Sequence, residues 1–170
     1  GPALIRFFVL FFVIMMALFT VELLPLGQQY FVTPLTSGLA AVSGVLIDLL
    51  GRDVLTQGVL IYDLNARFAI EIAAGCNGVE AMILLTAAIL AFPSPWKHKL
   101  IGIALGWIAI QGLNLVRIVS LFFLGLWNET AFEWAHLYLW QALIMLDALV
   151  VWLLWIRALP AREATSEVAA

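Results

Sequence analysis

The sequence is poor in charge. Charged residues make up only 11% of its 170 residues, whereas hydrophobic residues make up 65%. Soluble domains carry about 25% charged residues and at most about 50% apolar residues. The scarcity of charge therefore excludes an ordinary soluble domain. We predict an all-α integral membrane protein that is embedded in the lipid bilayer.

Cysteine is nearly absent as well. A single thiol excludes an internal disulfide, so the cysteine content says nothing about the redox compartment. The net charge of −3 carries little information, because membrane proteins distribute charge by side of the membrane rather than in total. We expect no metal ion, no cofactor and no nucleic-acid partner, and the sequence leaves the oligomeric state open.

The chain is short enough to form one domain, which we place at residues 3–159. Gly1-Pro2 resembles the remnant of an expression tag and is not part of the predicted domain. Residues 160–170 are polar and small, and they predict a disordered cytoplasmic tail. No internal repeat is visible.

Four long apolar runs are typical of a four-helix transmembrane bundle. A helix needs roughly 20 apolar residues to cross the hydrocarbon core of a bilayer. One of the runs is shorter, about 22 Å by helical rise, and it spans only where the bilayer thins or where its start dips below the headgroups. The expected spans are residues 4–24, 78–92, 100–126 and 137–159.

Two further elements are expected between the first two spans. Residues 39–50 are apolar but too short to cross, so they predict a short helix packed on, or partly sunk into, the extracytoplasmic face of the bundle. Apolar and polar residues roughly alternate on both sides of the turn at 63–66. This pattern predicts a β-hairpin of residues 57–62 and 67–72 just before the cysteine.

The positive charges predict the orientation. Cytoplasmic loops of membrane proteins carry an excess of lysine and arginine. With four spans all the relevant charges fall on one side, whereas a fifth span at 39–50 would separate them. We therefore expect both termini in the cytoplasm, in a multi-pass protein of the bacterial inner membrane. These charges are Arg6, Lys97, Lys99, Arg157 and Arg162.

Three polar residues are expected near the outer end of three different spans. Cys76 immediately precedes the second span, and His136 opens the fourth. Arg117 lies in the third span, about 10 Å below its outer end by helical rise. Their depths agree within one or two helical turns, so we expect a thiol, an imidazole and a guanidinium to meet at the periplasmic face.

These residue types together suit thiol acyl transfer. A thiol attacks as the thiolate, a histidine can take and return the proton, and an arginine can stabilise the oxyanion. Asn77 as N-cap and Glu80 three residues later form a capping-box-like pattern at the second span. The positive end of that helix should favour an anionic Cys76. We therefore predict a Cys76 that is at least partly thiolate.

Supporting roles remain open for several polar residues. Glu80 is either a helix cap or a partner for Arg117. Asn114 lies one turn before Arg117 and either holds it or binds substrate backbone. Each main residue also has a structural alternative. A lone cysteine is often an inert small hydrophobe, and a histidine can be an interfacial anchor. An arginine in a span costs about 2.5–3.5 kcal/mol on insertion scales, which favours a functional role for Arg117.

Three short motifs resemble the exosortase/archaeosortase family of membrane transpeptidases. They read "GCNGVE", "GLNLVRIVSLFFLG" and "WAHLYLWQ", in the family's order, within residues 55–158. Many members carry C-S-G and more spans, whereas this chain has C-N-G and four expected spans. "CNGVEAMILL" and "HLYLWQALIMLDALVV" are most similar to the short exosortase H subgroup, thought to serve targets with an IPTLxxWG-type signal.

The resemblance implies an activity and a set of roles. Cys76 corresponds to the nucleophile, Arg117 to the family's arginine and His136 to its histidine. The substrates would be exported proteins with a C-terminal sorting signal, which consists of a short motif, a transmembrane helix and a basic cluster. Cleavage would pass through a thioester, and the acyl group would then go to water or another nucleophile.

A different class of function competes with this one. Intramembrane polar residues can also line the pathway of a small transporter or channel subunit, although transporters commonly show internal repeats. A structural subunit of a larger complex is a third hypothesis. The residues concerned are Glu22, Glu80, Gln111, Arg117 and Asp147.

Overall fold

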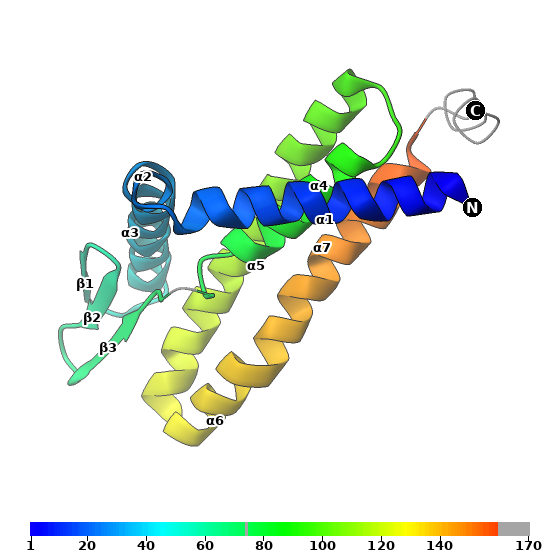
Figure 1. The fold of residues 1–170 in the computed structure, drawn as a ribbon. Helices are drawn as coiled ribbons and strands as arrows, with labels where there is room; N and C mark the ends of the chain where they lie inside the picture. The colour runs from blue at the N-terminus through cyan, green and yellow to red at the C-terminus, as the bar shows by residue number, and fades with distance from the viewer. Residues whose placement is uncertain (74, 160–170) are drawn as a thin grey trace.

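The computed structural model describes residues 1–73 and 75–159, and the described chain is mostly helical, with one small sheet (Figure 1). This confirms the predicted all-α membrane class. The long helices of the bundle are α1 (Pro2–Leu23), α5 (Trp96–Trp127) and α7 (Trp140–Arg157), together with the shorter α4 (Val79–Ala91). A one-turn helix α6 (Glu129–Trp134) and the π-helical segment η2 (Ala135–Leu139) lead into α7 without a break.

Aromatic contacts show how the bundle helices are oriented. The Phe7 ring of α1 lies 6.1 Å from Phe92, at the end of α4, and 5.9 Å from Trp152 in the last turns of α7. His98 in the first turn of α5 stacks on Trp155 at 5.0 Å. The start of α1, the end of α4, the start of α5 and the end of α7 therefore share one end of the bundle, as Figure 1 also shows.

The same end of the bundle holds four of the basic residues, whereas Arg52 and Arg67 lie beside the sheet and Arg117 lies beside Cys76. This agrees with the prediction that the charges lie on one side, although the predicted Arg162 lies outside the described residues. We name this the basic end. The Cys76 turn lies at the other end of the short α4, level with Gln111 and Arg117 of α5. The residues at the basic end are Arg6, Lys97, Lys99 and Arg157.

Small residues let the bundle helices approach closely. A Cβ atom built on Gly102 would lie 2.3 Å from the Trp155 ring, and one on Gly106 would lie 2.2 Å from Leu85. Without a hydrophobic force between helices in lipid, such close van der Waals contact is a main source of helix association. α4 and α7 are therefore packed against α5 along a stripe of glycines.

The segment after α1 corrects the predicted short helix. Helix continues from α2 (Pro25–Gly27) through the π-helical η1 (Gln28–Val32) into α3 (Thr33–Leu49), so the prediction of a helix starting at residue 39 is wrong. Two prolines lie in this helical segment, Pro25 and Pro34. Pro25 occupies a first-turn position, where its missing N–H costs nothing. The π-helical segment ahead of Pro34 loosens the helix where the proline ring would otherwise clash.

Four helical stretches of the described chain are long and apolar enough to cross a membrane: Pro2–Leu23, Pro25–Leu49, Trp96–Trp127 and Glu129–Arg157. The number of candidate spans agrees with the prediction, but one of the four helices is a different one. The expected span 78–92 is the 13-residue α4, which is too short by this measure, and Pro25–Leu49 takes its place.

Even so, α3 does not connect the two ends of the bundle. It starts beside the start of α4, because Asn77 Nδ2 donates a hydrogen bond of 3.2 Å to Thr36 Oγ1. Its last turns pack on the second half of α5, where Ile47 and Phe122 share one buried cluster. Both ends of α3 therefore lie away from the basic end, and α1, α4, α5 and α7 alone run between the two ends.

The sheet has three antiparallel strands in the order β1-β2-β3: β1 (Val54–Gln57), β2 (Leu60–Asp63) and β3 (Phe68–Glu71). The predicted hairpin corresponds to β2 and β3, but its first strand was placed at 57–62, and β1 was missed. Gly58, at φ 59°, turns the chain in the left-handed region, so Gln57 ends β1 and a new strand starts at Leu60.

Asp63 closes the loop between β2 and β3. Its carboxylate accepts hydrogen bonds from the backbone N–H groups of Asn65 (2.9 Å) and Ala66 (2.8 Å), and it pairs with Arg52 at 2.6 Å. Burial alone would raise the pKa of Asp63, but these hydrogen bonds and the Arg52 charge outweigh it, and the pKa is lowered. The loop is therefore fixed by a buried carboxylate that stays ionised.

The sheet is anchored to the second half of α5. Ile61 and Ile72 are buried in the cluster that also contains Ile47 and Phe122, and Phe68 meets Phe122 edge to face at 5.3 Å. β3 is thereby fixed beside α5 before the chain enters the cysteine turn.

Candidate active site

The cysteine lies in a turn that glycines make possible. Gly75 (φ 87°) and Gly78 (φ 74°) flank Cys76 in the left-handed region, which other residues adopt at a cost. The Cys76 N–H donates to Ala73 O at 3.0 Å. The chain leaving β3 thus reverses within a few residues and enters α4 at Val79.

Two neighbouring helices hold this turn. Gln111 of α5 donates from Nε2 to the Asn77 carbonyl at 2.9 Å, and Asn114 Nδ2 donates to Gln111 Oε1 at 3.1 Å. The Asn77 side chain reaches Thr36 of α3. Gly78 leaves the room for this contact, because a Cβ there would lie 2.9 Å from Gln111 Nε2.

The cap of α4 differs from the predicted capping box. Gly78, not Asn77, is the N-cap residue, since its left-handed backbone begins the helix. The Asn77 Oδ1 atom still accepts a hydrogen bond from the Val79 N–H at 3.1 Å. Asn77 is therefore one position too early for the predicted pattern with Glu80, but it satisfies a backbone donor at the start of the helix.

The structure brings the three predicted site residues together. Cys76 Sγ lies 2.8 Å from His136 Nε2, and Arg117 Nη2 donates to the same sulfur at 3.6 Å. The turn before α4, the middle of α5 and the π-helical η2 each contribute one group. A nucleophile and a base within hydrogen-bond reach are the geometry that covalent catalysis needs.

His136 is oriented by its local helix. The ring of Phe132 stacks on the imidazole, with ring centres 5.7 Å apart and planes within 4°. His136 sits in η2, and π-helical turns frequently occur at functional sites because they re-aim a side chain. The imidazole thereby presents its Nε2 edge to the thiol.

Arg117 is a buried cation with one hydrogen-bond donor that has no partner among the described residues. Its side chain is 1% exposed, and its Nε atom has no hydrogen-bond partner among the described residues. Buried donors are nearly always paired, so an unpaired one marks a place where another group can bind. Asn114 was predicted as a possible holder of Arg117, but its amide nitrogen instead supports Gln111.

The predicted thiolate is wrong for this resting geometry. Burial raises the pKa of the Cys76 thiol, Arg117 lowers it, and the carboxylate of Glu80 raises it further, with a net shift upward. The positive end of α4, which was expected to lower the pKa of Cys76, does not outweigh the effect of burial. The raised pKa favours the neutral thiol over the thiolate, and the contact with His136 offers the thiol proton a place to go when the sulfur attacks.

Glu80 lies in the first turn of α4, just after the cysteine turn. With Glu22 at the end of α1 and Glu71 at the end of β3, it lines a cavity of about 380 Å³ next to Asn77. Sequence reasoning offered Glu80 as a cap or as a partner of Arg117. In the structure it lines this acidic cavity, and its charge acts on both Cys76 and Arg117, which agrees with the prediction of a partner for Arg117.

Sequence reasoning missed the role of Gln111 and the stacking of Phe132. The sequence assigns Gln111 only to the competing pathway hypothesis. Its position six residues before Arg117 does not reveal that the Asn77 carbonyl lies within reach. Phe132 is one turn before His136, a spacing that does favour side-chain contact on a helix.

A helical membrane bundle with a thiol–imidazole pair and a buried arginine at one end defines a membrane protein suited to acyl transfer. The family model described as transmembrane exosortase matches residues 3–155. The chain therefore belongs to the transmembrane exosortase family, a family of membrane peptidases and transpeptidases. Among curated proteins and solved structures, none matches it significantly.

Proposed function

We propose that the protein is a cysteine-dependent transpeptidase that removes C-terminal sorting signals from exported, membrane-anchored proteins. The observation that carries this proposal is the contact of 2.8 Å between Cys76 Sγ and His136 Nε2, with Arg117 within reach of the same sulfur. Family membership supports the general activity, and this geometry supports the assignment of roles.

In the first step, Cys76 Sγ attacks the carbonyl carbon of the scissile peptide bond while His136 takes the thiol proton. The C–S bond forms and the carbonyl π electrons move to oxygen. The tetrahedral intermediate then collapses, the C–N bond breaks, and His136 returns the proton to the leaving amine. The product is a thioester between Cys76 and the exported protein.

The contact of Arg117 with the sulfur supports a role for this residue in stabilising the intermediate. The oxygen of the attacked carbonyl becomes a neighbour of Sγ, the atom to which Arg117 Nη2 now donates. The unpaired Nε–H offers a second donor from the same planar group. A preorganised cation in a site shielded from water stabilises developing negative charge far more than the same cation does in water.

In the second step the thioester is resolved. Water or an amine attacks the thioester carbonyl while His136 accepts its proton, the C–S bond breaks, and Cys76 regains a proton. Water would yield a free carboxylate, and an amine would yield a transferred product. His136 thus serves as base and acid in turn in both halves of the reaction.

The proposed location of the site follows from charge. If the basic end faces the cytoplasm, the Cys76 turn faces the periplasm of the bacterial inner membrane. A substrate held by a C-terminal transmembrane helix would present a peptide bond just outside that helix, at the depth of the turn. Its basic tail would remain in the cytoplasm.

The competing hypotheses are a transporter or channel subunit and a structural subunit. The polar residues weigh against a pathway, because Gln111 and Arg117 contact the cysteine turn and Glu22 lines a cavity beside it. Asp147 lies 11 residues beyond His136, about 16 Å away by helical rise, with one buried oxygen unpaired in the described chain.

The test is co-expression with a membrane-anchored reporter that ends in a C-terminal sorting signal encoded in the same genome. Wild-type protein should shorten the reporter, seen by gel mobility, and intact mass should define its new C-terminus. Cys76→Ala should leave the reporter intact at equal expression. Unchanged processing by Cys76→Ala would reject the cysteine mechanism, and a transporter or structural subunit should tolerate this substitution.

A further inference from the structure

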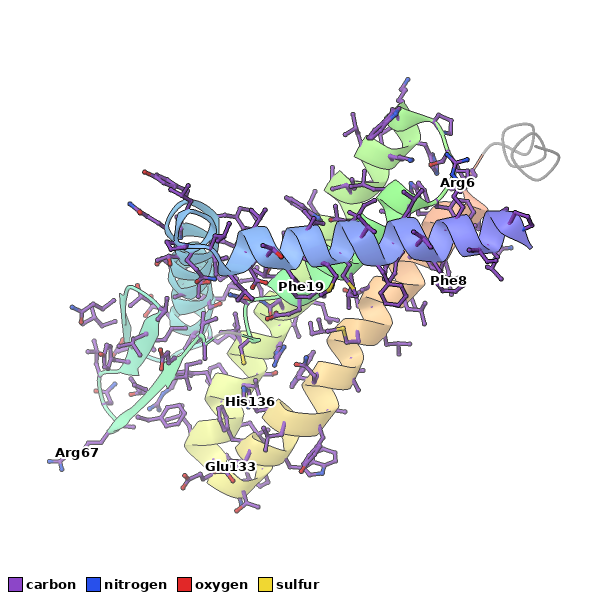
Figure 2. The ribbon with its side chains drawn as sticks, viewed as in Figure 1. Arg6, Phe8, Phe19, Arg67, Glu133 and His136 are labelled. Carbon is purple, nitrogen blue, oxygen red and sulfur yellow. The ribbon has the colours of Figure 1, made fainter. Side chains whose placement is uncertain are left out.

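A groove of about 520 Å³ opens beside the candidate active site. One wall is the strand β3 and its continuation to Ala73. The other wall is formed by Gly125 at the end of α5, by α6 and by His136. Figure 2 shows Arg67 at the far start of β3, and Glu133 and His136 along the opposite wall. His136 belongs both to this groove and to the pair with Cys76.

The β3 wall is a free sheet edge. β3 pairs with β2 on one side, and no strand of the described chain pairs with its other side. The Ile72 N–H donates to Val59 O at 3.0 Å, in the same register as the β2–β3 ladder. Bonded pairs alternate in an antiparallel ladder, so the N–H and C=O groups of Ala69 and Glu71 point away from β2. These groups form a ready template for another strand.

The distance between the walls is fixed by packing. Phe68 lies against Gly125, where an added Cβ would approach the Phe68 ring to 2.5 Å, and it also meets Phe122. Phe132 of α6 stacks on His136. The strand and the histidine are therefore held in a constant relation to each other, as a peptide-binding edge next to a catalytic group requires.

The groove is acidic. Glu71, Glu129 and Glu133 line it, and its lining contains no lysine or arginine. A peptide with acidic side chains would be repelled by these carboxylates, whereas one with basic or neutral side chains would be favoured. An apolar lipid tail would meet the wrong chemistry here, because both the backbone edge and the carboxylates need polar partners.

We infer that the groove binds the segment of the substrate upstream of the scissile bond, as an extended strand added to the free edge of β3. This rests on the proposed function. Main-chain hydrogen bonds to Ala69 and Glu71 would supply affinity, as in other cases of strand addition to a sheet edge. The edge from Ala69 to Ala73 is about 13 Å long, which fits roughly four or five extended residues.

The direction of the added strand follows from the topology. β3 runs from the outer loop at Arg67 towards the Cys76 turn. The substrate enters from its exported domain and continues into its transmembrane helix, so its chain also runs towards Cys76. The substrate strand is therefore parallel to β3, and residues farther upstream of the scissile bond lie nearer to Ala69 than to Ala73.

The single cysteine makes a direct test possible. Cys76→Ala leaves a chain without cysteine that should also leave its substrate uncleaved. Ala69→Cys or Ala73→Cys is added to this background, with Leu55→Cys as the matched control. Leu55 is exposed on β1, the opposite edge strand. The probe is the sorting-signal reporter, with one cysteine moved along the segment upstream of its cleavage site, and disulfides are read after mild oxidation.

The expected result is disulfide formation at Ala69→Cys with reporter positions two residues apart, and at Ala73→Cys with positions closer to the cleavage site. Leu55→Cys should form at least tenfold less product. Equal yields at all three sites, reversed order, or no bond at β3 would overturn the inference. Processing of the cysteine-bearing reporters by wild-type protein tests the proposed function separately, since a reporter that is processed yet never bonds β3 contradicts only the groove.

A second measurement uses the charge of the groove. Aspartate placed in the paired segment of the reporter should slow processing by wild-type protein about fivefold, a factor typical of one exposed charge contact. Glu129→Lys with Glu133→Lys should abolish or reverse this preference. The same reporter rate with aspartate, alanine and lysine would contradict an acidic binding groove.

Discussion

Cys76 Sγ and His136 Nε2 lie 2.8 Å apart although 60 residues separate them in the chain. The contact depends on two irregular backbone features, the glycine turn before α4 and the π-helical η2. Neither residue lies within a regular α-helix. The site is thus built from a turn before a helix and from an irregular turn within one, and the long α5 supplies the buried Arg117.

Replacement of the thiol should abolish processing. Cys76→Ala should leave no detectable product, and Cys76→Ser should fall by at least about 1,000-fold, because a hydroxyl is the weaker nucleophile and leaving group. Both variants should keep the melting temperature of the wild-type protein in detergent within a few degrees. A folded Cys76→Ser variant with near-normal rates would show that sulfur chemistry is not used.

Arg117 should be sensitive to the shape of its group as well as to its charge. Loss of one oxyanion donor typically lowers the rate by roughly 100- to 1,000-fold. Arg117→Ala should reach this range, and Arg117→Lys should fail nearly as badly because lysine lacks the planar fork. Single-turnover rates with the reporter measure the effect. Recovery of most activity in Arg117→Lys would mean that only a point charge is needed.

His136→Ala should bind the reporter without cleaving it. No group would then take the thiol proton or return it to the leaving amine. Uncleaved reporter should co-purify with this variant in greater amount than with wild-type protein. Phe132→Leu, which keeps His136 but removes the stacked ring, should reduce the rate less. Equal processing by His136→Ala and wild type would remove the imidazole from the mechanism.

The thiol should titrate above its ordinary range. Because burial raises the pKa of Cys76, labelling by a small membrane-impermeant thiosulfonate should be less than half maximal at pH ~8.5, the free-thiol value. Glu80→Gln removes a nearby negative charge and should move the profile to lower pH, whereas Arg117→Gln should move it higher. Intact spheroplasts should label from outside. Labelling only after the inner face is opened would invert the proposed topology.

The turn should depend on Gly78 for two reasons. Gly78→Ala places a Cβ at a left-handed residue, which costs about 1–2 kcal/mol, and also against Gln111. Gly51→Ala is the matched control, because Gly51 has φ 103° but open space around it. Both variants should lower the melting temperature, but only Gly78→Ala should also slow processing. Equal processing rates in the two variants would show that activity does not depend on the contact between Gln111 and the cysteine turn.

Helical rise made part of this site predictable. Span counting places Cys76, Arg117 and His136 at similar depth because a regular helix advances by a fixed length per residue. It cannot give the rotation of each helix, so the contact of Gln111 with Asn77 stayed hidden. It also cannot compare how much burial raises the pKa of Cys76 with how much a helix end lowers it. For this reason the expected thiolate disagrees with the raised pKa.

The errors in the fold have a common local cause. The short helix was predicted to start at residue 39, yet helix already runs from Pro25, which occupies a first turn, and includes Pro34, which follows a π-helical segment. Gly58 was read as part of a strand, although its positive φ makes a turn. Composition predicted the all-α membrane class. The exact ends of helices and strands depend on backbone geometry, which the identity of a single residue does not determine.

The π-helical turn at Ala135–Leu139 ties the site to the length of the chain as well as to its residue types. Such a turn holds one residue more than the α-helical turn that it replaces. Deleting a single residue there would restore a regular helix and rotate everything before it by about 100° relative to α7. His136 would then swing away from Cys76 with every functional side chain still present. In relatives of this chain, a one-residue gap in this segment would therefore signal a displaced histidine even where the motif letters agree.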